Sequence, residues 1–320
     1  MASVHIGEYF VNFSNLKIDF MGKRRIAAIV SGIALLVSAI SLATQGLRMG
    51  IDFTGGTLLE VGYEQPVKLA DIREILRATG YGNAQVQHFG TTHEVLIRLP
   101  LEEGVSSADV SAQVMEKLNA SGNAQGHNQR VEFVGPQVGD ELTEDGGLAV
   151  LYSLFGILVY VSWRFEYKFS VGGVAALAHD VLITLGFFSV LHLEFDLTVL
   201  AAVLAVIGYS LNDTIVVYDR IRENFRRMRK GLPEDIMNVS LNQTLSRTLM
   251  TGFTTLLVLF ALAALGGEAI HNFSLALIVG IVVGTYSSIY VASPIVLGLG
   301  VTQADLIPPE KEGTEVDDRP

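Results

Sequence analysis

The sequence of 320 residues contains no cysteine and has few charged residues, which make up 17% of the chain. Without cysteine it cannot form a disulfide, a thiolate zinc cluster or a thiol nucleophile. Apolar residues make up 50% of the chain, and the mean hydropathy is +0.42. A soluble domain of this length needs more polar surface, so several membrane spans are expected.

Positive charge is also in short supply. There are 22 Lys and Arg against 33 Asp and Glu, giving a net charge of −11. Most of the acidic excess lies in one hydrophilic block, residues 46–145, and the tail from Val301 adds more. Nucleic acid needs a cationic surface, so we exclude it as a partner.

Long apolar runs, by contrast, are abundant. Each is near or above the length of about 20 residues that a helix needs to cross the hydrocarbon core. They lie at 26–45, 147–163, 169–190, 197–218, 248–267 and 274–300. The first run is longer than the apolar part of a signal peptide, and no A-x-A cleavage site follows before Gly46. We therefore expect an uncleaved anchor and six transmembrane helices.

Lysines and arginines cluster before the first run, between the second and third, and between the fourth and fifth. The short loops 191–196 and 268–273 contain none. By the positive-inside rule, both termini lie in the cytoplasm and residues 46–146 lie outside, a position that in a bacterial inner membrane corresponds to the periplasm. The expected organisation is a cytoplasmic N-terminus (1–25), a first span (26–45), a periplasmic domain (46–146), a five-helix bundle (147–300) with a cytoplasmic loop (219–247), and an acidic cytoplasmic tail (301–320).

The hydrophilic block alternates between short strand and helix patterns. Strands are expected at 57–63, 84–89, 95–99 and 130–134, and helices at 69–78 and 107–118. The order βαββαβ is that of a ferredoxin-like α+β domain. The predicted fold is therefore an α-helical polytopic membrane protein with an inserted ferredoxin-like domain.

Two glycine-rich segments connect this block to the spans. Gly50-Ile-Asp-Phe-Thr-Gly-Gly-Thr57 lacks the GxxxxGK[ST] pattern of a phosphate-binding loop, so Gly55 and Gly56 indicate a tight turn that leads into a strand. In Val134-Gly-Pro-Gln-Val-Gly139, Gly135 and Gly139 indicate a corner that returns the chain to the membrane.

Asp213 falls inside the fourth span, about 9 Å from mid-membrane, next to Asn212. A carboxyl group there costs about 2.5–3.5 kcal/mol, so it should face protein or water. One interpretation is a functional ionisable group. The other is a buried residue that only joins helices by hydrogen bonds.

Three further ionisable residues lie in or near the spans. His179 and Asp180 occupy the middle of the third span, and their side chains point about 100° apart on a helix. A packing role and a role in a polar pathway are both open for them. Arg247 begins the fifth span, where it is either an interfacial anchor or a charge partner for Asp213.

Four segments together carry a family resemblance: GIDFTGGT after the first span, VGPQVG before the second, GYSLNDTIVVYDRIREN at the end of the fourth and SLNQTLSRT before the fifth. In this order and over nearly the whole chain, they resemble the SecD/SecF family of the resistance-nodulation-division superfamily. The resemblance implies pairing with a SecD-like subunit and use of the proton-motive force to promote preprotein movement through the SecYEG channel. It also places the family's proton-pathway aspartate at Asp213 and its arginine at Arg247.

We therefore expect a transport subunit, not an enzyme, whose proton pathway comprises Asp213, Arg247 and Asn212. Protons, preproteins and membrane lipids are its expected partners, and no motif calls for a metal, nucleotide or other cofactor. An intramembrane aspartyl protease using Asp180 and Asp213 is disfavoured because the GxGD element is missing. A small-solute exporter of the superfamily would carry two halves in one chain. A passive assembly subunit without its own proton pathway remains the alternative.

Overall fold

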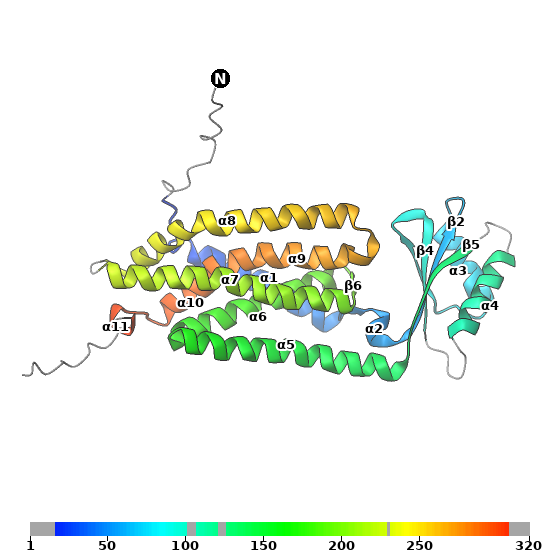
Figure 1. Cartoon of the computed structure of the whole chain (residues 1–320), viewed down its shortest axis with the longest axis horizontal. Coiled ribbons are helices and arrows are strands. Elements are labelled where there is room, and N and C mark those ends of the chain that lie inside the picture. The colour runs from blue at the N-terminus through cyan, green and yellow to red at the C-terminus, as the bar shows by residue number, and fades with distance from the viewer. Residues whose placement is uncertain (1–16, 101–106, 121–125, 229–230, 307–320) are drawn as a thin grey trace, which may run out of the picture.

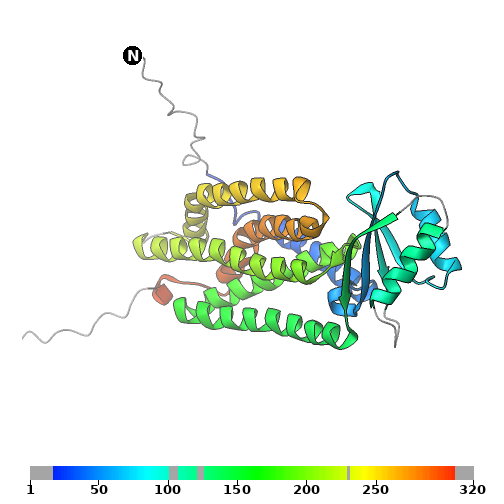
Figure 2. The ribbon, with the colours of Figure 1, turned by 45° about the vertical axis from the view of Figure 1, so that its right-hand side comes forward.

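The structure is a computed structural model that describes residues 17–100, 107–120, 126–228 and 231–306. The described chain forms a bundle of long helices with an α+β domain at one end (Figures 1 and 2). The predicted cytoplasmic N-terminus and acidic tail lie largely outside the described residues.

Six helical segments are long and apolar enough to cross a membrane, which confirms a multi-pass membrane protein. The sixth passes through a π-helical turn, Ser288–Ala292, and continues as α10. The segments are α1 (Arg24–Thr44), α5 (Pro136–Arg164), α6 (Tyr167–Val190), α7 (Leu197–Arg227), α8 (Pro233–Leu265), and α9 (Glu268–Ser287) with α10 (Ser293–Gly298).

The predicted cytoplasmic loop 219–247 is helical over residues 219–227 and 233–247. Helix α7 runs on to Arg227 and α8 begins at Pro233, so the two helices form a hairpin beyond their apolar parts. The Asn224 side chain joins them by donating to Ser240 Oγ and Gln243 Oε1, both at 2.9 Å. The apolar run ends where charged residues begin. The helix continues beyond that point because the charged residues are themselves good helix formers.

Helices α6, α7 and α9 form the interior of the bundle, while α1, α5 and α8 lie outside them and expose many apolar side chains. In Figure 1, α8 and α5 lie on opposite edges of the bundle. The interior carries buried serines and threonines as well as apolar residues. Such small polar residues allow close helix packing and hydrogen bonds between helices in a membrane.

The α+β domain has the element order βαββαβ, as predicted. Its elements are β2 (Gly56–Tyr63), α3 (Leu69–Ala78), β3 (Gln85–Phe89), β4 (Thr91–Leu99), α4 (Ser107–Ala120) and β5 (Gly126–Val134). The sheet order is β3-β4-β2-β5, with every neighbouring pair antiparallel. Leu59, Val61 and Ile97 of the sheet pack with Ile72 of α3 and Val114 of α4 in one core. Both helices cover the face of the sheet that points away from the bundle (Figure 2).

The domain and the bundle meet at a short parallel pairing of β1 (Arg48–Met49) with β6 (Glu194–Phe195), the latter in the connection from α6 to α7. The four-residue helix α2 (Ile51–Thr54) follows β1. Its Phe53 ring stacks on Phe195, with centroids 5.9 Å apart. At the opposite end of the bundle, the short helix α11 (Gln303–Leu306) is held by an ion pair of 2.7 Å between Asp305 and Lys168.

Candidate intramembrane polar site and its link to the α+β domain

Asp213 lies on α7 with its side chain turned into the bundle, and the residue is 3% exposed. Its Oδ2 accepts one long hydrogen bond, 3.5 Å, from Thr285 Oγ1 on α9. The described side chains provide no ion pair for this carboxyl group. It therefore retains acceptor capacity in a buried position, which is costly unless water, a proton or a moving cation satisfies it.

Arg247 lies on α8, which packs against both α7 and α9, but its side chain is exposed. Direct pairing with Asp213, one of the two predicted possibilities, is not formed in this structure. Thr248, the next residue, is buried, and its hydroxyl group has no partner among the described residues. Asn212 is exposed, so it does not share the buried position of Asp213.

His179 and Asp180 belong to a buried hydrogen-bonded network, and each residue is less than 5% exposed. Asp180 Oδ2 accepts from Ser210 Oγ of α7 at 2.5 Å and from Ser287 Oγ of α9 at 2.8 Å. Its Oδ1 lies 2.9 Å from Nδ1 of His179. The adjacent side chains face different helices, as the helical geometry predicted, yet they remain bonded to each other.

From His179 the network continues to α1. His179 Nε2 lies 3.2 Å from Ser31 Oγ, which lies 3.0 Å from the Tyr286 hydroxyl oxygen. Tyr286 donates its only proton to the carbonyl oxygen of Ala27. Ser31 must then donate to Tyr286 and accept from His179 Nε2. The contact of 2.9 Å between Nδ1 and the Asp180 carboxyl group extends this chain of hydrogen bonds from α1 to α6.

The two buried carboxyl groups thus differ in their surroundings. Asp180 has three close partners, whereas Asp213 has one distant partner. No hydrogen bond joins the two carboxyl groups among the described residues. Fixed hydrogen bonds hold Asp180 in one arrangement, and Asp213 is the less constrained of the two.

The glycine-rich segment that follows β1 contacts the start of α7. Asp52 Oδ2 accepts a hydrogen bond of 2.9 Å from the backbone N–H of Leu197, the first residue of that helix. Gly50 N–H donates to the carbonyl oxygen of Phe195 at 2.8 Å. Asp196, the N-cap residue, accepts from the N–H of Val199 at 2.8 Å. Two carboxyl groups therefore satisfy free N–H groups of α7, one of them from the domain connection.

Three of the four predicted glycines have a structural reason. Gly55 and Gly56 adopt φ values of +67° and +135°, which other residues rarely reach. At Gly139 an added Cβ would lie 2.9 Å from the carbonyl oxygen of Phe53, so the start of α5 packs directly on this turn. At Gly135, φ is −69° and no atom lies within 4 Å of an added Cβ. The space around Gly135 does not require glycine.

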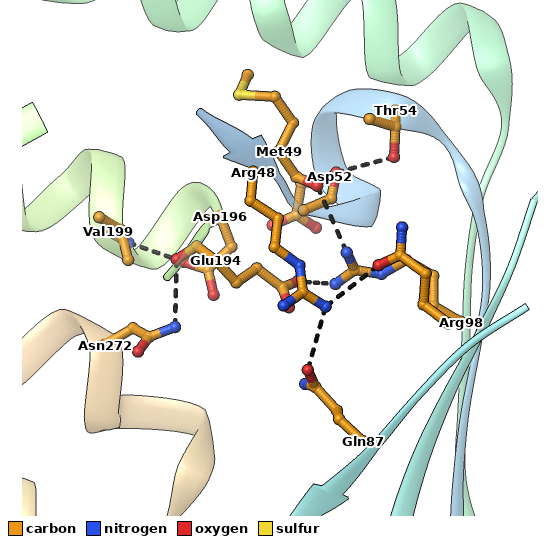
Figure 3. A network of polar contacts seen from close by, with 12 residues as sticks. Arg48, Met49, Asp52, Thr54, Gln87, Arg98, Glu194, Asp196, Val199 and Asn272 are labelled. Carbon is orange, nitrogen blue, oxygen red and sulfur yellow. Dashed lines mark hydrogen bonds and ion pairs between the residues drawn. The ribbon is translucent and has the colours of Figure 1, made fainter. Parts of the chain in front are cut away.

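A second set of contacts ties the sheet to the bundle (Figure 3). Arg98, near the end of β4, forms an ion pair with Glu194 of β6 and donates to the carbonyl oxygen of Met49 at 3.4 Å. The side chains of Arg98 and Glu194 are 11% and 18% exposed. Burial, with the nearby Arg48, lowers the pKa of Arg98 to about 10, so it still carries its charge at neutral pH.

Sequence reasoning missed these junction residues. Asp52 stood within the glycine-rich segment, and no local pattern connects it with Leu197, 145 positions away. Arg98 and Glu194 are 96 positions apart and gave no local signal. Ser31, Ser210 and Ser287 were detectable as polar residues in apolar runs. Their common contact with the His179–Asp180 pair was not.

Comparison with known proteins places this architecture. The model of the SecD/SecF GG motif matches residues 40–67, and the model of the C-terminal part of the protein export membrane protein SecD/SecF matches residues 113–302. The chain is 54% identical to the protein translocase subunit SecF of Vibrio alginolyticus over 305 residues, covering 95% of this chain and 97% of that protein. It is 48% identical to SecF of Pseudomonas aeruginosa, covering 95% and 98%.

A solved structure agrees with these relatives. A crystal structure of SecDF, described as a translocon-associated membrane protein, from Thermus thermophilus superposes with a TM-score of 0.81 at 40% identity. It covers 89% of this chain, whereas the match spans 39% of the SecDF chain. SecDF in a super-membrane-facing form gives a TM-score of 0.67 over the same shares. The chain belongs to the SecD/SecF family of protein export membrane proteins.

Proposed function

We propose that this chain is the smaller subunit of a protein-export complex that pairs with a SecD-like subunit and uses the proton-motive force to promote preprotein movement through SecYEG. The similarity to SecF proteins over nearly the full length supports the export role. The similarity to less than half of a SecDF chain supports a partner that supplies the remainder. The exposed apolar faces of α1, α5 and α8 offer surface to such a partner or to lipid.

The proposed orientation places both termini in the cytoplasm and the α+β domain in the periplasm. Basic residues gather at the helix ends that lie opposite the domain: Arg24 begins α1, Arg164 ends α5, and Lys168 and Arg226 lie near the start of α6 and the end of α7. Positive charge retained on the cytoplasmic side determines the orientation of helices on insertion.

Asp213 is the proposed proton carrier, and the observation that carries this proposal is its buried, incompletely bonded carboxyl group. A carboxyl group in this position changes protonation when water enters or a cation approaches. Arg247 is the proposed cation. It is exposed in this structure, so its approach belongs to a second arrangement of α8 against α7. Each proton that crosses supplies about 2.3 kcal/mol per 100 mV.

His179 and Asp180 have a supporting role in this proposal. The three close partners of Asp180 and the contact of His179 with Ser31 make the network a fixed junction between α1, α6, α7 and α9. Movement of α7 near Asp213 then reaches the α+β domain through the cap that Asp52 provides on Leu197. The domain is the part that would act on a preprotein outside the membrane.

The test is preprotein translocation into inverted membrane vesicles at fixed ATP, with and without a proton gradient. Asp213→Asn is nearly isosteric and removes the charge, so we expect assembly to survive and the stimulation by the gradient to disappear. Asp219→Asn is the matched control, because Asp219 is an exposed carboxylate on the same helix, paired with Arg164 at 3.0 Å. Normal stimulation in Asp213→Asn would leave a passive assembly subunit as the correct interpretation.

Arg247 is tested in the same assay. Arg247→Met should lose the stimulation because the carboxyl group has no cation to approach it. Arg247→Lys keeps the charge without the planar guanidinium group, so partial stimulation is expected if charge is what matters. Full stimulation in Arg247→Met would remove Arg247 from the proposed pathway.

A further inference from the structure

A groove of about 690 Å³ runs along the bundle between α1, α6 and the π-helical turn that leads into α10. Its α1 wall extends from Arg24 to Leu35, twelve residues or about 16 Å of helix. Small residues at Ala28, Gly32 and Ala178 make the hollow, since larger side chains would fill it. Its length is close to half the thickness of the hydrocarbon core, about 15 Å.

The groove carries charge at one end only. Arg24 and Arg25 lie at the basic end of the bundle, and the lining beyond them is mainly apolar. Arg25 is exposed and has no acidic partner among the described residues. Arg24 pairs with Glu234 at 2.8 Å, and its side chain remains 35% exposed. A ligand that fits has an anionic head and a long apolar chain.

The surroundings of the groove indicate where this ligand comes from. Beside the groove, α1 exposes Ile29, Ile33 and Leu36, each about 60% exposed, which is the pattern of a lipid-facing helix. Basic pockets between transmembrane helices bind anionic lipid headgroups. We propose that this groove is a binding site for one anionic phospholipid, with its phosphate at Arg24 and Arg25 and an acyl chain along Gly32 and Ala178.

A bound acyl chain would also have a consequence inside the bundle. His179 and Ser31 contribute to the groove wall, and both belong to the buried hydrogen-bonded network. When the groove is occupied, the acyl chain excludes water from the faces of these two side chains that line it. The lipid would thus preserve the hydrogen bonds of His179 with Ser31 and Asp180.

The chain offers a matched pair of variants. At Gly32 in the groove and at Gly156 on the outer helix α5, no atom lies within 4 Å of an added Cβ. Gly32→Leu fills the groove, whereas Gly156→Leu adds the same side chain to an open surface. Arg25→Gln removes one charge at an exposed position, and Arg220→Gln is its control at the same end of the bundle.

The experiment is native mass spectrometry of the full chain, purified together with its SecD-like partner and titrated with phosphatidylglycerol or phosphatidylcholine. We expect one phosphatidylglycerol to be retained in preference to phosphatidylcholine. Gly32→Leu should lose that lipid. Arg25→Gln should weaken its binding about fivefold, the attraction of one arginine for anionic lipid. Gly156→Leu and Arg220→Gln should bind as the wild type does.

Equal retention of both lipids, or unchanged binding in Gly32→Leu, would overturn the proposal. If Gly32→Leu does not assemble, Arg25→Gln decides alone, because a surface arginine is not needed for packing. A photoreactive residue in place of Leu35 identifies which molecule occupies the groove. Cross-linking to phospholipid supports the site, and cross-linking to the partner subunit or to a second copy of this chain refutes it.

Discussion

Asp52 and Leu197 are 145 positions apart, yet the carboxyl group of the first accepts the backbone N–H of the second at 2.9 Å. The glycine-rich segment of the α+β domain connection therefore caps the helix that carries Asp213. A free N–H group at a helix start has no partner within the helix, and a carboxylate there also interacts favourably with the helix dipole. The contact joins the domain to the centre of the bundle through one rigid element.

Replacing Asp52 by Ala should expose the start of α7. Loss of a capping side chain costs about 1 kcal/mol, so we expect a small drop in thermal stability and faster amide hydrogen exchange in the first turn of α7. Asp71→Ala, in the first turn of α3, is the control because α3 lies away from the bundle. Unchanged exchange at residues 197–200 in Asp52→Ala would show that the cap is not formed.

Gly139 and Gly135 allow a comparison of the same substitution at two close positions. Gly139→Ala places a Cβ 2.9 Å from the Phe53 carbonyl oxygen and 3.0 Å from the Gly55 nitrogen. We expect it to force α5 away from the turn at a cost of about 1–3 kcal/mol. Gly135→Ala meets open space at an ordinary φ, so it should cost less than about 1 kcal/mol, the part that comes from placing Ala at the N-cap of α5. Thermal unfolding in detergent compares them, and equal stability of the two variants would contradict the close packing.

The ion pair between Arg98 and Glu194 should hold the α+β domain in its position on the bundle. Both side chains are largely buried, so Arg98→Gln leaves the carboxylate of Glu194 without its partner, at a cost of about 2–3 kcal/mol. The double variant Arg98→Glu/Glu194→Arg should recover part of this loss. Arg130→Gln, which breaks the more exposed Arg130–Glu132 pair on β5, should change stability by less than about 1 kcal/mol.

The domain position itself gives the second readout for this pair. Spin labels on α3 and on the exposed face of α5 should report a single distance in the wild type and a broader distribution in Arg98→Gln. A narrow, unchanged distribution would mean that the pairing of β1 with β6 holds the domain without the ion pair.

Asp180 and Asp213 should respond differently to truncation. Asp180→Ala leaves the Ser210 and Ser287 hydroxyl groups and His179 without their acceptor, and we expect a loss of about 3 kcal/mol or more. Asp213→Ala removes one bond of 3.5 Å and a buried carboxyl group, so stability should change little or increase. Thermal unfolding of both variants checks the order, and a larger loss in Asp213→Ala would contradict the distinction between them.

The Asp305–Lys168 pair gives a pH-dependent prediction. Hydrogen bonds from Lys168 and Thr302 lower the pKa of Asp305 to about 2, below its usual 3.8. The folded pKa is the lower one, so the contact contributes its full stabilisation above pH 3.8 and loses it as pH falls through about 2. Carboxyl carbon NMR of Asp305 checks this. In Lys168→Gln the midpoint should rise towards 3.8.

Much of the fold was predictable because local patterns dictate it. Helix α3 has the predicted bounds, Leu69–Ala78, since its apolar residues repeat at helical spacing. The start of α5 at Pro136 was missed because residues 136–146 are polar and were assigned to the hydrophilic block. Asp213 could be singled out by its cost in the membrane. Asp180 and Asp213 differ in the hydroxyl groups that contact them from α7 and α9. No local sequence pattern indicates which hydroxyl group contacts which carboxyl group.

Helix α7 is one continuous helix that is longer than the membrane is thick. Its 31 residues measure about 46 Å, whereas the hydrocarbon core is about 30 Å thick. A tilt of about 5° around the end near Asp52 would move the other end by about 4 Å, from the helix length alone. Because Asn224 joins that end to α8, the displacement passes to a second helix, the one that carries Arg247. A small tilt at the domain connection would thereby give a larger displacement at the far side of the bundle.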